Sequence, residues 1–111
     1  MELLIGSFLH TAEWRREKAE EFPDDDRNIA AAELLEQLAT GAGDLRGTDL
    51  EQRYFKVLER ADGHPDVHLL CEAESEALRS VGFHSWPANA TEFVDDLVTK
   101  LDDLCSEDAE A

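Results

Sequence analysis

Basic residues are scarce in this chain. Among its 111 residues, 10 lysines and arginines stand against 27 aspartates and glutamates, which gives a formal net charge of −17. A surface of this charge repels phosphate backbones and anionic lipids rather than attracting them. We therefore expect neither direct nucleic-acid binding nor a membrane partner. The acidity itself has three open explanations, namely solubility, a basic protein partner, or life in high salt.

Cysteines and long hydrophobic runs are also few. Cys71 and Cys105 are the only cysteines, and both stand where an apolar side chain would serve, so we interpret them as buried thiols. The opening segment, residues 1–5, carries an acid where an export signal would carry lysine or arginine, and its apolar run is too short to span a bilayer. These features predict a cytoplasmic protein.

The familiar catalytic and cofactor signatures are absent from the sequence. There is no phosphate-binding Gly-Lys-Ser/Thr, no His-Glu-x-x-His and no Cys-x-x-Cys. The glycine-rich stretch at 41–47 lacks the third glycine of a dinucleotide fingerprint and follows a predicted helix rather than a strand. No cofactor is predicted, and the sequence favours a binding protein over an enzyme.

The chain does contain clear helical periodicity. Apolar residues recur at three- and four-residue spacings, and no segment keeps the alternation of a strand. Thr48 with Glu51, and Asn89 with Glu92, have the spacing of capping boxes at helix starts. Glycines and prolines separate the periodic segments. We predict helices over about residues 2–22, 25–40, 50–61, 67–81 and 90–104.

This pattern predicts an all-α fold. Residues 1–105 are expected to form a single helical domain, either a bundle or an orthogonal array of about five amphipathic helices. Residues 106–111 are acidic and poor in apolar side chains, so we expect this tail to fray. The sequence does not choose between the bundle and the array.

One polar turn has the residues to hold a metal. His64, Asp66 and His68, with Glu72 one helical turn later, bring together the imidazoles and carboxylates that divalent ions favour. The alternative is an ordinary helix start, in which Asp66 caps the helix and Glu72 is a solvated neighbour. We keep a divalent-metal site as the second functional hypothesis.

One face of the first helix has the composition of an interaction surface. His10, Glu13 and Glu17 share a side opposite the main apolar stripe, and Trp14 lies on that side with Leu3. A large aromatic residue on a polar face is typical of protein interfaces. The partner would be another protein or a second copy. In the alternative, Trp14 packs under loops or under the acidic tail.

The predicted loop at 83–87 contains Phe83, His84 and Trp86. A loop this apolar either anchors itself on the core or forms an exposed contact patch. We favour the anchor, and Trp86 is kept with Trp14 as a candidate partner-binding residue.

Two charged residues fall within predicted apolar stripes. Arg15 plots inside the apolar arc of the first helix, and Glu74 plots near the centre of that of the fourth. An unpaired buried charge is costly. We hypothesise that the two side chains pair across the domain, with the alternative that each extends to water at a helix margin.

The leading functional hypothesis is a regulatory or adaptor module that binds another protein. Trp14 and Trp86 are its preferred anchors. The alternatives are the divalent-metal protein or enzyme described above, and an acidic decoy that imitates nucleic acid toward a basic DNA-binding protein.

Overall fold

Five helices make up the fold in the computed structural model, which describes the backbone of residues 2–65 and 67–110. Within these ranges there is no β-strand, and the all-α prediction is confirmed. The helices are α1 (Glu2–Glu21), α2 (Arg27–Gly43), α3 (Asp49–Asp62), α4 (Val67–Ser80) and α5 (Ala90–Glu110).

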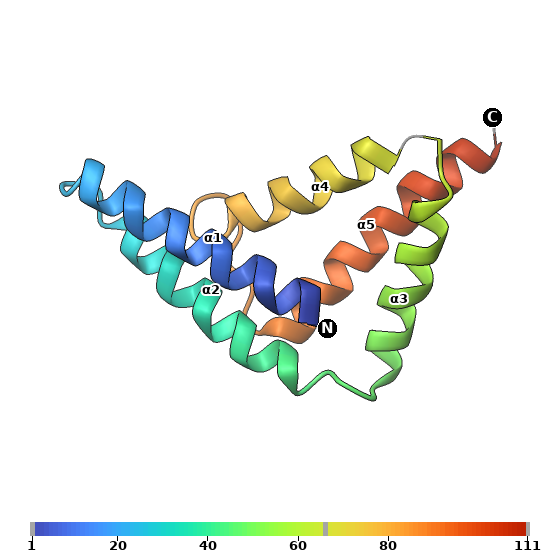
Figure 1. Cartoon of the computed structure of the whole chain (residues 1–111), viewed down its shortest axis with the longest axis horizontal. Coiled ribbons are helices and arrows are strands. Elements are labelled where there is room, and N and C mark those ends of the chain that lie inside the picture. Colours follow the sequence, from blue (N-terminus) through green and yellow to red (C-terminus); the bar gives the residue numbers. More distant parts are fainter. Residues whose placement is uncertain (1, 66, 111) are drawn as a thin grey trace.

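The helices are arranged around α5. α1 and α2 form an antiparallel hairpin, while α3 and α4 pack against α5, and α4 also reaches α1 (Figure 1). In Figure 1, α5 crosses the α1–α2 hairpin at a wide angle instead of running along it. The molecule is flat, with extents of 47 × 30 × 19 Å. Many side chains of α1 and α4 therefore face solvent on one side.

Both predicted capping boxes are present. The hydroxyl of Thr48 accepts a hydrogen bond from the Glu51 amide at 3.3 Å, and the Glu51 carboxylate accepts one from the Gly47 amide at 2.9 Å. Asn89 accepts from the Glu92 amide at 2.9 Å. These bonds satisfy backbone donors that have no partner inside the helix, and they determine where α3 and α5 begin.

Two helix ends differ from the predictions. α2 continues to Gly43, because Gly41 packs against the start of α5, where its Cβ position lies 3.2 Å from the Cβ of Ala90. α5 continues to Glu110, beyond the predicted end near residue 104. Two glycines lower the helical propensity at the end of α2, and apolar side chains are scarce beyond residue 105 in α5, so the sequence pattern does not mark either last turn.

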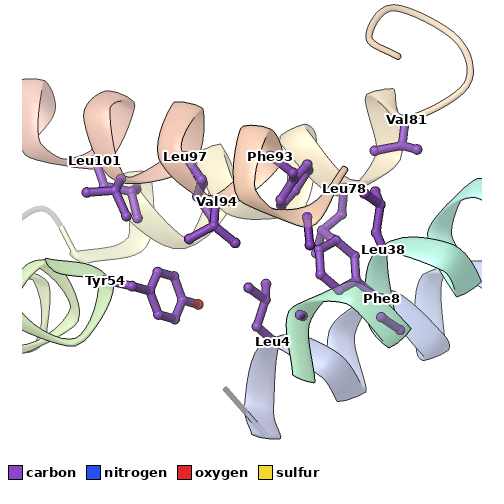
Figure 2. Packing of buried hydrophobic residues seen from close by; sticks show 14 of the residues in the cluster. Leu4, Phe8, Leu38, Tyr54, Leu78, Val81, Phe93, Val94, Leu97 and Leu101 are labelled. Carbon is purple, nitrogen blue, oxygen red and sulfur yellow. The ribbon is translucent and has the colours of Figure 1, made fainter. Parts of the chain in front are cut away.

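The core is apolar and lies where α1, α2, α4 and α5 meet. Phe8 on α1 is fully buried and meets the ring of Phe93 on α5 edge to face, with ring centroids 5.0 Å apart. Tyr54 enters the same core from α3 (Figure 2). Such edge-to-face pairs add to the stabilisation that burial provides. The aromatic pair therefore joins the N-terminal hairpin to the central helix.

The two cysteines have different environments. Cys105 is buried in the core, as predicted, whereas Cys71 is exposed, and both are free thiols. The prediction for Cys71 is wrong because α4 turns Leu70 and Ala73 inward, which leaves Cys71 on the solvent side.

Candidate functional site

A groove runs between α1 and α4. Its volume is about 650 Å³, and its walls combine exposed apolar side chains with a histidine and an arginine. Leu3 is 86% exposed at one end, while Trp14 is partly buried near the other. The lining residues are Glu2, Leu3, Gly6, Ser7, His10, Thr11 and Trp14 from α1 and Ser75, Leu78 and Arg79 from α4.

The structure brings part of the predicted α1 surface into this groove. His10 and Trp14 line it, while Glu13 is exposed on α1 outside it. Trp14 also borders a second hollow of about 380 Å³ that continues along α1. Glu17 lines that hollow, together with Lys18, Glu20 and Glu21. The surface of α1 is therefore apolar around Leu3 and Trp14 and acidic toward its C-terminal end.

The sequence does not predict that residues of α4 form the second wall of the groove. Ser75 and Arg79 are polar and exposed, and no sequence motif connects them with Leu3 or Trp14. Only the packing of α4 beside α1 makes them neighbours of these residues. Leu78 is buried in the core, and its side chain contributes to the groove as well.

Arg15 contacts several elements of the fold at the Trp14 end of the groove. Its guanidinium donates a hydrogen bond to the Arg79 carbonyl at the C-terminal end of α4, and a long one of 3.4 Å to the buried Asn28 on α2. The same group lies 4.5 Å from the ring centre of Trp14 and 4.0 Å from that of Phe83. One side chain thus connects α1, α2, α4 and the following loop.

The hypothesis that Arg15 pairs with Glu74 is wrong. No ion pair joins the two side chains within the described part of the chain, because Arg15 turns toward the C-terminal end of α4 instead. Burial lowers the pKa of Arg15, and the nearby charges of Arg27 and Arg79 lower it further. The guanidinium is instead stabilised by the carbonyl at the negative C-terminal end of α4, by the rings of Trp14 and Phe83, and by the charge of Asp25.

Glu74 on α4 instead lies near Tyr54 of α3. Burial raises the pKa of the Glu74 carboxyl above its ordinary value. Burial also raises the pKa of Tyr54 beyond its usual range, and the negative charge of Glu74 contributes to that shift. The two groups therefore share an interior that disfavours negative charge.

We expect Glu74→Gln to stabilise the protein at neutral pH and to have little effect in acid. The folded state holds the Glu74 proton more tightly than the unfolded chain, so stability is lost as pH rises from the ordinary value of 4.5 through the raised pKa. Melting temperatures of wild type and variant across this range test the expectation. Glu76→Gln, which changes an exposed residue of the same helix, is the control. An equal rise in melting temperature in both variants, independent of pH, would contradict the expectation.

The aromatic loop after α4 is divided between core and solvent. Phe83 is partly buried beneath Arg15, and Arg27 lies 4.9 Å from the same ring. Trp86 is 67% exposed. The anchor interpretation therefore applies to Phe83, while the Trp86 side chain faces solvent.

The predicted metal turn is only partly within the described residues. Among these residues, no group of three or more His, Cys, Asp or Glu side chains is placed to hold a metal ion. His68 and Glu72 are exposed, and His64 is partly exposed. Asp66 lies outside the described residues. The four-residue site stays a prediction from the sequence.

No protein-family model, no curated protein and no solved structure matches the chain. In the part of the chain that the structure describes, no helix has both the length and the apolar character needed to cross a membrane.

Proposed function

We propose that the protein is an interaction module whose α1–α4 groove takes an apolar segment of a partner protein. One observation carries the proposal: Leu3 is 86% exposed in a groove that also contains Trp14 and has Leu78 at its base. Leucine and tryptophan side chains that meet in a concave surface are typical of the centre of protein interfaces.

The charge of the chain supports a different protein as the partner, rather than a second copy. Two molecules of net charge −17 repel each other as they approach. The hollow beyond Trp14 is lined by Glu17, Glu20 and Glu21, with a single lysine, Lys18, paired to Glu21 at 2.8 Å. A partner segment with apolar residues followed by basic ones complements both parts of this surface.

The test compares one leucine inside the groove with one outside it. Leu3→Glu places a charge in the groove, whereas Leu9→Glu makes the same change on α1 at a side chain that is 49% exposed outside the groove. We expect Leu3→Glu to weaken capture of the partner at least about tenfold, since burying a leucine contributes about 1.5–3 kcal/mol. Leu9→Glu should bind like the wild type.

Tagged wild type and variants are incubated with native lysate, and the partner retained in high salt is quantified by mass spectrometry. Retention in high salt is expected because apolar contacts are not screened. Equal retention by Leu3→Glu and Leu9→Glu would exclude the groove as the binding site. A basic DNA-binding protein that is released by salt from all variants would favour the acidic decoy instead.

A further inference from the structure

A separate pocket lies beside Trp86, where the C-terminal end of α4, the loop after it and α5 meet. Its volume is about 310 Å³. Its walls combine the exposed indole with two carboxylates and one amine. The lining residues are Ala77, Ser80, His84, Ser85, Trp86, Pro87, Glu92, Phe93, Asp96, Leu97 and Lys100.

The turn that presents Trp86 is held firmly. The amides of Phe83, His84 and Ser85 all donate to the Ser80 carbonyl, at 3.0, 2.8 and 3.0 Å. The Gly82 amide donates to the Ser85 carbonyl at 2.8 Å, which closes the turn. An aromatic residue on a preorganised turn loses little further conformational entropy when a partner binds.

The residue after the indole is also fixed. Pro87 is buried, so the chain on both sides of Trp86 is tied to the domain while the indole itself stays 67% exposed. The fold therefore holds a large aromatic surface in water instead of allowing it to turn into the core.

The charges around the indole are mainly negative. Asp96 on α5 is exposed and forms no ion pair with any residue that the structure describes. Glu92 uses one carboxylate oxygen as acceptor for the Ala88 amide at 3.2 Å, which leaves its other oxygen available. Lys100 borders the pocket one turn beyond Asp96. Two carboxylates and an aromatic face outweigh this single amine.

We propose that this pocket binds an arginine side chain of a partner protein. A guanidinium stacks on an indole face and donates paired hydrogen bonds to a carboxylate, whereas an ammonium makes only a point contact. The chain already uses this chemistry internally, because Arg15 lies 4.5 Å from the Trp14 ring centre. The net charge of −17 attracts a basic partner to the surface. The proposal does not depend on the α1–α4 groove.

The test uses Trp86 as its own reporter. In Trp14→Phe, the indole of Trp86 is the only tryptophan, so its fluorescence reports on this pocket. The probe is a short peptide of arginine and glycine, compared with the same peptide carrying citrulline, lysine or leucine in place of arginine. We expect a saturable fluorescence change with arginine, a weaker one with lysine, and none with citrulline or leucine.

Matched variants separate the pocket from general attraction to an acidic protein. Asp96→Asn should weaken binding of the arginine peptide about two- to fivefold, as expected for a partly exposed charge pair. Asp103→Asn removes the same charge from an exposed site farther along α5, outside the pocket, and should have a smaller effect. Lys100→Gln should strengthen binding, because it removes the one amine of the pocket.

Several results would overturn the proposal. Equal effects of Asp96→Asn and Asp103→Asn would show non-specific attraction, and equal binding of lysine and arginine would show a point charge without stacking. Saturable binding of the leucine or citrulline peptide would make the pocket an apolar site. Calorimetry measures the affinity of the arginine peptide for Trp86→Ala without relying on fluorescence. An affinity equal to that of the wild type would show that the peptide binds outside this pocket. Loss of the groove partner through Leu3→Glu leaves all these results unchanged, so the two proposals fail separately.

Discussion

Replacing Gly82 by alanine is expected to lower the free energy of unfolding by about 2–5 kcal/mol. Gly82 has a φ of 82°, in a region where an L side chain costs about 1–2 kcal/mol. A Cβ at this position would also lie 2.6 Å from the Cβ and 2.8 Å from the Cα of Ala31, a buried residue of α2. Backbone shifts that relieve such overpacking cost about 1–3 kcal/mol.

Gly47→Ala is the matched control for this prediction. Gly47 has nearly the same φ, 79°, but a Cβ there meets no described atom within 4 Å. Gly47→Ala should therefore lower the free energy of unfolding only by the conformational cost of an L residue at positive φ, about 1–2 kcal/mol. Denaturant unfolding followed by circular dichroism gives both values. Equal losses would mean that the loop moves away from Ala31 without penalty, and the turn that presents Trp86 would then be less firmly held than its hydrogen bonds indicate.

Replacing Arg15 by alanine is expected to lower the free energy of unfolding by about 2–4 kcal/mol. The change removes the hydrogen bond to the Arg79 carbonyl and leaves the buried Asn28 oxygen without its donor, which costs about 1–3 kcal/mol. It also removes contacts with the rings of Trp14 and Phe83, and such cation–π contacts contribute about 0.5–2 kcal/mol.

Arg16→Ala is the control for Arg15→Ala. Arg16 pairs with Glu36 on α2, but both side chains are nearly half exposed, at 48% and 44%, so this pair contributes about 0–1 kcal/mol. Arg15→Lys should recover less than half of the loss, since a lysine retains the charge but not the planar contacts. Denaturation midpoints measure all three variants. A similar loss in Arg15→Ala and Arg16→Ala would mean that the ring contacts contribute little.

Much of the candidate site was visible in the sequence as residue types, but its geometry was not. Trp14 on a polar helix face predicted an interaction surface, and the structure does place Trp14, His10 and Leu3 around one groove. The opposite wall is formed by Ser75 and Arg79, which lie more than sixty positions beyond Trp14 in the chain. No spacing rule connects such distant segments, because periodicity describes one element at a time.

For the two aromatic residues after α4, too, the sequence identifies the residue types but not where each side chain lies. The sequence identified an apolar loop that either anchors itself on the core or stays exposed, and the structure divides the two outcomes: Phe83 is partly buried, whereas Trp86 is exposed. Their separation follows from the close approach of Gly82 to Ala31 and from the position of Arg15, which covers Phe83. These contacts form only when α1, α2 and the loop have packed.

The sequence by itself determined the all-α class, the five helices and the capped starts of α3 and α5. Those features depend on interactions within about four residues of each other, which a linear pattern displays directly. Tertiary structure alone decided that Arg15 meets the end of α4 rather than Glu74, that Cys71 faces solvent, and that a groove and a tryptophan pocket remain open. The reason is physical: amphipathic periodicity specifies which face of a helix is buried, whereas the neighbour that buries it depends on how all the helices pack at once.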